Sequence, residues 1–164
     1  MKLSHLNELF VHQLHDLYDA EVQLIDALPR WVDSASHPQL REAFKGHLDE
    51  TRRQRERLNA IFQHLGLERR DARCVAMGRL IDDVEQAADA AGDADVKDAA
   101  LIAAVQRIKH YEIAGYGTAR THAKRLESDD VFLLLQETLL EERAADERLT
   151  EIAEQHINPA AAGR

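Results

Sequence analysis

A glutamate inside an apolar helical stripe constrains this chain more than any other feature. Apolar residues recur at three- and four-residue intervals on both sides of Glu112, and these are Leu101, Val105, Ile108, Ala119, Ala123 and Leu126. This period predicts a long helix whose buried face includes Glu112. Burying an ionised carboxylate without a partner is costly or forces it to take up a proton. The rest of the chain must therefore supply opposing groups or a cation.

Composition limits the class of protein. A chain of 164 residues fits one domain, and only three prolines and seven glycines are typical of a mostly helical protein. A net charge of −9 disfavours nucleic acid and anionic membranes as partners. The single cysteine excludes an internal disulfide. We find neither a signal-peptide core nor an uncharged apolar run long enough for a membrane span, and we expect a soluble cytoplasmic protein.

Apolar periodicity predicts an all-α fold with four long helices. We place them at about 4–35, 38–65, 93–126 and 130–156. Inside the first helix, Pro29 predicts a kink or an early end near Leu28. Gly66 suits the position just after the second helix.

The stretch from 67 to 92 is too long for a tight turn and includes the pattern of a shorter helix. It predicts a crossover that makes the second and third long helices parallel, as in some four-helix bundles. We therefore expect one four-helix bundle over residues 1–157, with a long crossover carrying a short extra helix. Residues 158–164 have no packing pattern, and we expect a flexible tail there.

Each long helix carries an acidic residue at or beside the middle of its inward face. These residues are Glu21, Glu50, Glu112 and Glu142. Packing the helices together would bring four carboxylates to one depth, where they would repel strongly unless they were neutralised. Two metal ions would neutralise them, and dinuclear sites in helical bundles combine such glutamates with histidine. Oxygen-rich ligation with an imidazole favours iron or manganese and leaves zinc open.

Two further residues share a helix face with these acids and are candidate ligands. His47 lies three residues before Glu50, and Asp146 lies four residues after Glu142. Taken singly, each position has a plainer interpretation: Glu50 solvated or paired with an arginine, His47 in the core, Glu142 on the surface. Four acids in four inward stripes favour the metal site over these interpretations.

A run of arginines on the second helix permits a nucleic-acid patch as a weaker hypothesis. The run consists of Arg52, Arg53, Arg55 and Arg57, and Asp49, Glu50 and Glu56 intersperse it. We interpret it as a solvated helix face, because the overall charge is acidic.

Several segments together resemble the ferritin-like family of bacterial stress-response proteins typified by YciF and YciE. They cover nearly the whole chain in order: 17–24, 47–51 with Gln54, 74–77, 98–104, 110–118 and 141–142. The resemblance implies a ferritin-like four-helix bundle with an added short helix, a dinuclear metal site at mid-bundle and a homodimer. It ties the family to stress responses without fixing a reaction. Iron(II) oxidation or peroxide reduction would be the expected chemistry if the metal pair reacts.

One departure from the family pattern affects the metal site. Where the resemblance implies an acid three residues before Glu112, this chain has Lys109. Its ammonium can pair with Glu112 or Glu142 and replace part of the metal's charge, which would weaken or empty one metal position. The alternative hypothesis is therefore a metal-free helical scaffold or partner-binding dimer, in which Lys109 neutralises the buried acids.

Overall fold

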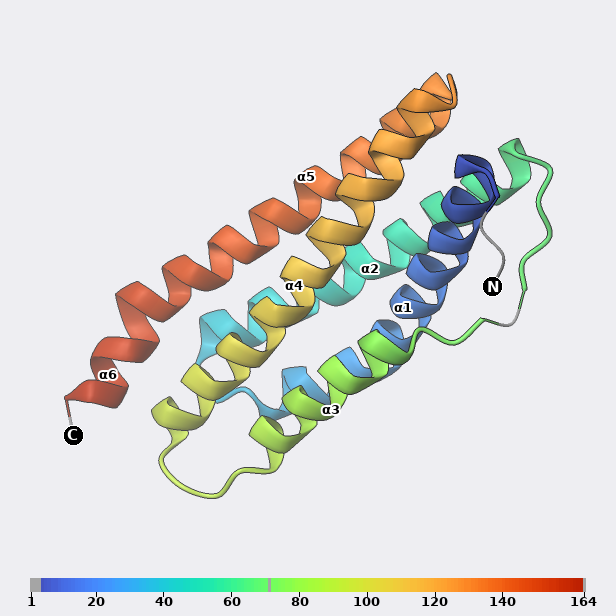
Figure 1. Cartoon of the computed structure of the whole chain (residues 1–164). Coiled ribbons are helices and arrows are strands. Elements are labelled where there is room, and N and C mark those ends of the chain that lie inside the picture. Colours follow the sequence, from blue (N-terminus) through green and yellow to red (C-terminus); the bar gives the residue numbers. More distant parts are fainter. Residues whose placement is uncertain (1–3, 71, 164) are drawn as a thin grey trace.

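The chain folds into a bundle of four long helices with one shorter helix on its side (Figure 1). The computed structural model describes residues 4–70 and 72–163. The four long helices are α1 (Leu6–Ser34), α2 (Pro38–His64), α4 (Ala94–Arg125) and α5 (Asp129–Ile152). The shorter helix is α3 (Val75–Asp89), and the chain ends in a π-helical turn η1 (Ala153–Ile157) and α6 (Asn158–Ala162). The described residues form no strand, which confirms the all-α prediction.

The crossover has the predicted form. After α2 the chain runs back along α1 and α4 as α3, so that α4 starts at the same end of the bundle as α2 and runs parallel to it (Figure 1). Gly66, with φ of +63°, ends α2 in the left-handed conformation that glycine adopts without strain. Asp93 caps α4 by accepting hydrogen bonds from the backbone N–H groups of Asp95 and Val96.

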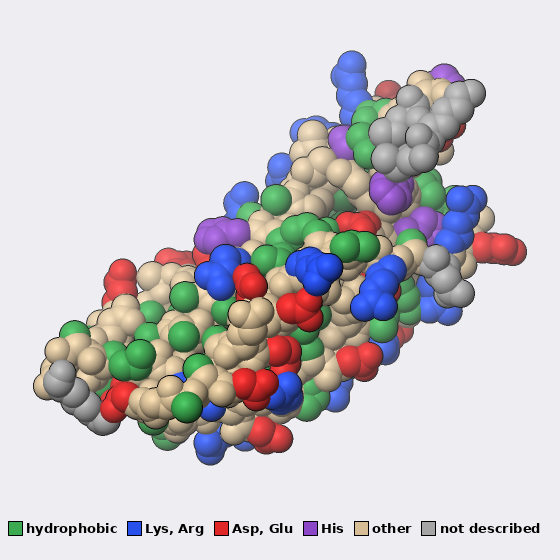
Figure 2. All heavy atoms as spheres, turned by 60° about the horizontal axis from the view of Figure 1, so that its bottom comes forward, with side chains coloured by type: hydrophobic (Ala, Val, Ile, Leu, Met, Phe, Trp, Pro, Cys, Tyr) green, Lys and Arg blue, Asp and Glu red, His purple; other side chains and the backbone are tan. Residues whose placement is uncertain are grey.

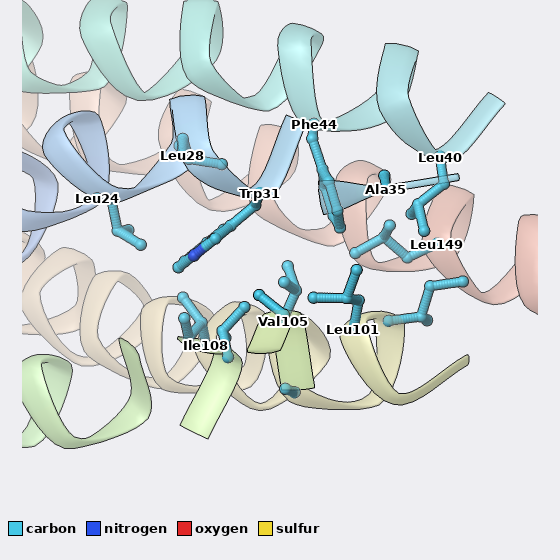
Figure 3. Packing of buried hydrophobic residues seen from close by; sticks show 14 of the residues in the cluster. Leu24, Leu28, Trp31, Ala35, Leu40, Phe44, Leu101, Val105, Ile108 and Leu149 are labelled. Carbon is cyan, nitrogen blue, oxygen red and sulfur yellow. The ribbon is translucent and has the colours of Figure 1, made fainter. Parts of the chain in front are cut away.

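Pro29 does not end α1 near Leu28. The helix continues to Ser34, with Pro29 inside it. Trp31 explains the difference, because it is fully buried and its Nε1 donates a 2.8 Å hydrogen bond to Glu85 on α3. Figure 3 shows Trp31 among Leu24, Leu28 and other labelled core residues. Burying a large aromatic side chain offsets the backbone hydrogen bond that proline removes.

The expected C-terminal tail contains a short helix. Residues 158–162 form α6, with Pro159 in its first turn, a position that proline favours. The preceding residue, Ile157, is fully buried and belongs to the main apolar core. Ile157 is the last residue of the predicted bundle, and its burial holds the start of α6 against the core.

The apolar core is divided into two clusters by a polar layer. On α1, Leu17 belongs to one cluster and Leu24 to the other, and Glu21 lies between them. On α4 the flanking residues are Tyr116 and Ile108. The same arrangement holds on α2, between Leu58 and Phe44, and on α5, between Leu139 and Leu149. All four long helices therefore contribute to one polar layer near mid-length.

Helix α4 approaches α1 closely at this level. A Cβ atom added to Gly115 would lie 2.9 Å from Leu17 Cδ2, closer than side-chain atoms normally pack. Glycine therefore lets α1 and α4 pack near enough for their polar side chains to meet in the layer.

Candidate metal centre

The polar layer contains a compact cluster of buried ionisable side chains. Glu21 comes from α1, His47 from α2, Lys109 and Glu112 from α4, and Glu142 from α5. All five side chains are buried, and Lys109, Glu112 and Glu142 have no exposed surface. Ionised groups are rarely buried without partners, so their contacts decide what the cluster can do.

Lys109 lies at the middle of three of these side chains. Its Nζ lies 2.5 Å from His47 Nε2, 2.5 Å from Glu142 Oε2 and 2.8 Å from Glu112 Oε2. The ligand atoms of these three partners lie within 4.8 Å of one another, a spacing that could hold a metal ion. The ammonium thus stands where the ligand atoms converge.

The charges of the neighbours set the protonation states around Lys109. Two carboxylates, Glu112 and Glu142, raise the pKa of Lys109 in spite of its burial, so it stays an ammonium. Burial and then the Lys109 charge lower the pKa of His47 well below 6.5. A neutral His47 whose Nε2 accepts a hydrogen bond from the Lys109 ammonium fits both shifts.

Two carboxyl groups of the cluster have oxygens without hydrogen-bond partners. Tyr116 donates a hydrogen bond to Glu21 Oε1, while Glu21 Oε2 has no partner. Glu112 Oε1 has no partner either, and Glu112 Oε2 pairs only with the Lys109 ammonium, at 2.8 Å. Burial, followed by the charge of Glu142, raises the pKa of Glu21 to about 8 and that of Glu112 well above 4.5. Without a metal ion Glu21 is therefore mostly protonated at neutral pH.

Glu142 is held by a polar bridge from α2. Gln54 Nε2 donates to Glu142 Oε1 at 2.8 Å and to Glu141 Oε2 at 3.0 Å. Arg57, one turn further along α2, donates from NH1 to the same Glu141 oxygen at 3.0 Å and to Thr138 Oγ1 at 2.7 Å. These contacts fix α2 against α5 beside the cluster. The sequence placed Gln54 in the polar stripe, but the role of Glu141 could not be found from helical periodicity.

The two remaining predicted ligands lie at the edge of the cluster. Glu50 is half-buried, and burial raises its pKa while the Arg148 charge opposes the shift. Asp146 is also half-buried, and its Oδ1 accepts a 3.3 Å hydrogen bond from Gln106 Nε2. Its other oxygen lies 3.6 Å from His110 Nε2. The converging group of His47, Glu112 and Glu142 includes none of Glu21, Glu50 and Asp146.

A narrow crevice between α2 and α5 reaches the cluster. His47 and Glu50 line one side, Ala145 and Arg148 line the other, and Lys109 lies at its inner end. Its volume of about 10 Å³ is close to the space that a single water molecule needs. The centre is therefore nearly sealed from solvent on this side.

The arginine run on α2 is largely neutralised by acids. Arg52 pairs with Asp49, Arg55 pairs with Glu56, and Arg57 pairs with Glu137 as well as with Glu141. On the face in Figure 2, acidic and basic side chains also lie interspersed. These pairs weigh against a nucleic-acid patch.

Among the described residues, no helix combines the length and apolar character that crossing a membrane requires.

Comparison with known proteins identifies the family. The family described as a domain of unknown function, DUF892, matches residues 5–162. The chain belongs to this family. Protein YciF of Escherichia coli strain K12 is 40% identical over 159 residues, which are 96% of each chain. This confirms the resemblance drawn from the sequence.

Solved structures support the DUF892 assignment. The crystal structure of the E. coli stress protein YciF is 39% identical, with a TM-score of 0.92 over 95% of this chain and 99% of that one. YcfI, a putative structural protein from Rhodopseudomonas palustris, is 38% identical, with a TM-score of 0.86 over 91% and 95%. A protein from Xanthomonas campestris, 20% identical with a TM-score of 0.73 over 92% of each chain, shares the fold.

Replacing Glu21 with glutamine tests the raised pKa of this group. In the unfolded chain Glu21 ionises near 4.5, whereas in the folded protein it does so near 8. Between these values the folded state binds the extra proton, so the contribution of Glu21 to stability falls as pH rises. Glutamine stays neutral, and the Glu21→Gln variant should gain about 3 kcal/mol relative to the natural chain between pH 5 and pH 7. Urea titrations of both metal-free proteins measure the gain, and a constant difference across this range would refute it.

Proposed function

We propose that this chain is a ferritin-like stress-response protein that binds a divalent metal ion, iron or manganese, at its mid-bundle carboxylate cluster. The observation that carries the proposal is the pair of buried carboxylate oxygens without a partner, Glu21 Oε2 and Glu112 Oε1. Buried polar atoms nearly always have a partner, and oxygen ligands from carboxylates suit these two metals. The name of the E. coli relative, a stress protein, supports the biological setting.

The residues that would hold the ion are Glu21 and Glu112, with Glu142 as a neighbouring carboxylate. A bound iron ion would supply one-electron redox chemistry, which iron(II) oxidation or peroxide reduction requires. The protein would contribute the nearly sealed cavity and the Tyr116 hydroxyl, which orients Glu21. A homodimer in the cytoplasm, expected from the resemblance and the sequence, belongs to the same proposal.

Metal titration of the chelator-treated protein tests this function. Calorimetry with Mn²⁺ at pH 7.5 should show saturable binding. Loss of a group that only supports a metal ligand weakens affinity by up to about 100-fold, so loss of a ligand itself, in Glu112→Gln, should weaken it by at least about 100-fold. Glu147→Gln, an exposed change on α5, is the matched control and should bind as the natural chain does. Binding of less than about 0.2 ions per chain would contradict the proposal.

A second candidate function is the metal-free helical scaffold. It is favoured by Lys109, which already pairs with Glu142, and by the raised pKa values of Glu21 and Glu112, which favour their protonated forms. With both groups protonated, the cluster would be neutral without any ion. The same titration separates the two functions, because the scaffold would take up no metal at any pH.

A further inference from the structure

We infer that the centre takes a single divalent ion and that the Lys109 ammonium permanently holds the place of a second one. The inference rests on the proposed function and deepens it, since it fixes how many ions the site accepts. A dinuclear centre, which the resemblance implies, does not fit the side chains that this chain brings together.

Geometry supplies the first argument. A lysine ammonium has three hydrogens, and Lys109 has three partners at 2.5–2.8 Å, namely His47, Glu112 and Glu142. These are the same three residues whose ligand atoms converge within 4.8 Å. Metal ions bind such atoms at about 2.0–2.2 Å, so an ion held by all three would overlap Nζ. The converging triad is therefore filled by the chain itself.

Charge supplies the second argument. The buried acids of the cluster are Glu21, Glu112 and Glu142, and the buried cation is Lys109, so full ionisation leaves two negative charges. One divalent ion balances them, whereas two ions would leave the buried layer with a positive excess. An acid at position 109 would instead make four negative charges, enough for two divalent ions. Exchanging a carboxylate for an ammonium changes the charge by two units, which is the charge of one such ion.

The free oxygens locate the remaining position. Glu21 Oε2 and Glu112 Oε1 are buried and accept no hydrogen bond, whereas both oxygens of Glu142 are occupied, by Gln54 and by Lys109. The available ligand atoms therefore belong to Glu21 on α1 and Glu112 on α4. An ion bound by these two oxygens would use no atom that Lys109 contacts.

Counting bound ions in charge variants tests the inference. The natural chain, Lys109→Glu and the control Lys97→Glu are treated with chelator, loaded with Mn²⁺, desalted and analysed by mass spectrometry for metal per chain. Lys97 lies on the same helix more than three turns before Lys109 and is half-exposed. We expect one ion per chain in the natural protein and the control, and two in Lys109→Glu. If Lys109→Glu does not fold, Lys109→Asp removes the same ammonium with a shorter acid, restores four negative charges and should also bind two.

The outcomes separate this inference from the proposed function. Two ions in the natural chain, or one ion in both the natural chain and the folded position-109 variants, would overturn the inference. No ion in the natural chain but one in Lys109→Glu would reject the proposed function and keep the assignment of Lys109 to a metal position. No ion in any of the proteins would reject both.

Discussion

Replacing Lys109 with methionine should lower the free energy of unfolding of the metal-free protein by about 3–5 kcal/mol, the range measured when one partner of a buried ion pair is removed. Methionine keeps most of the side-chain volume, so the decrease in the free energy of unfolding comes from lost charge and hydrogen bonding more than from lost packing. Glu142 would remain buried with only Gln54 as a partner, and His47 would lose its donor. Urea denaturation at pH 7 in the presence of chelator measures the change.

An exposed lysine provides the control for this experiment. Lys45 on α2 lies 3.8 Å from Glu42, and more than half of its side chain is exposed. Exposed pairs of this kind contribute little, and Lys45→Met should stay within about 0.5 kcal/mol of the natural chain. A loss below about 1 kcal/mol for Lys109→Met would mean that Lys109 is not the cation that holds the acids together.

Saturating metal should stabilise the natural chain by about 4 kcal/mol when the free Mn²⁺ concentration is 1,000 times the dissociation constant. The ion binds the folded cluster and has no preformed site in the unfolded chain. Binding displaces the proton of Glu21, so the affinity should rise with pH up to about 8, the pKa of Glu21. Urea midpoints with and without Mn²⁺, at pH 6 and at pH 8, measure both effects.

Loss of one ligand should remove this stabilisation. The Glu112→Gln variant should show the same urea midpoint with and without Mn²⁺, while the exposed Glu147→Gln variant should keep the full shift. Equal stabilisation of the natural chain and of Glu112→Gln would place the bound ion elsewhere on the acidic surface.

Much of the fold could be predicted from the sequence, because helix stripes and end signals are local. The stripe around Glu112 predicted a buried acid, and the structure places Glu21, Glu112 and Glu142 in one layer. The predicted first helix, 4–35, agrees with α1, and of the two effects left open for Pro29 the early end near Leu28 does not occur. The sequence pattern gave no sign of the helix at 158–162, which begins beside the buried Ile157.

The level of the site along the helices could be predicted better than the set of residues that form it. Helical phase places Glu50 about 60° from His47 around α2, so it lies on the flank, while Gln54 takes the inward position. Asp146 shares a face with Glu142, but a side chain from α4, Gln106, binds it. Pairings across helices depend on rotamers and interhelical distances, which periodicity does not contain.

The most direct measurement is an anomalous-scattering map of crystals of the natural chain grown with Mn²⁺. We predict one peak beside Glu21 and Glu112, with the Lys109 ammonium among His47, Glu112 and Glu142. Two peaks at mid-bundle with Lys109 turned away, or acidic side chains pointing outward into solvent, would contradict the account.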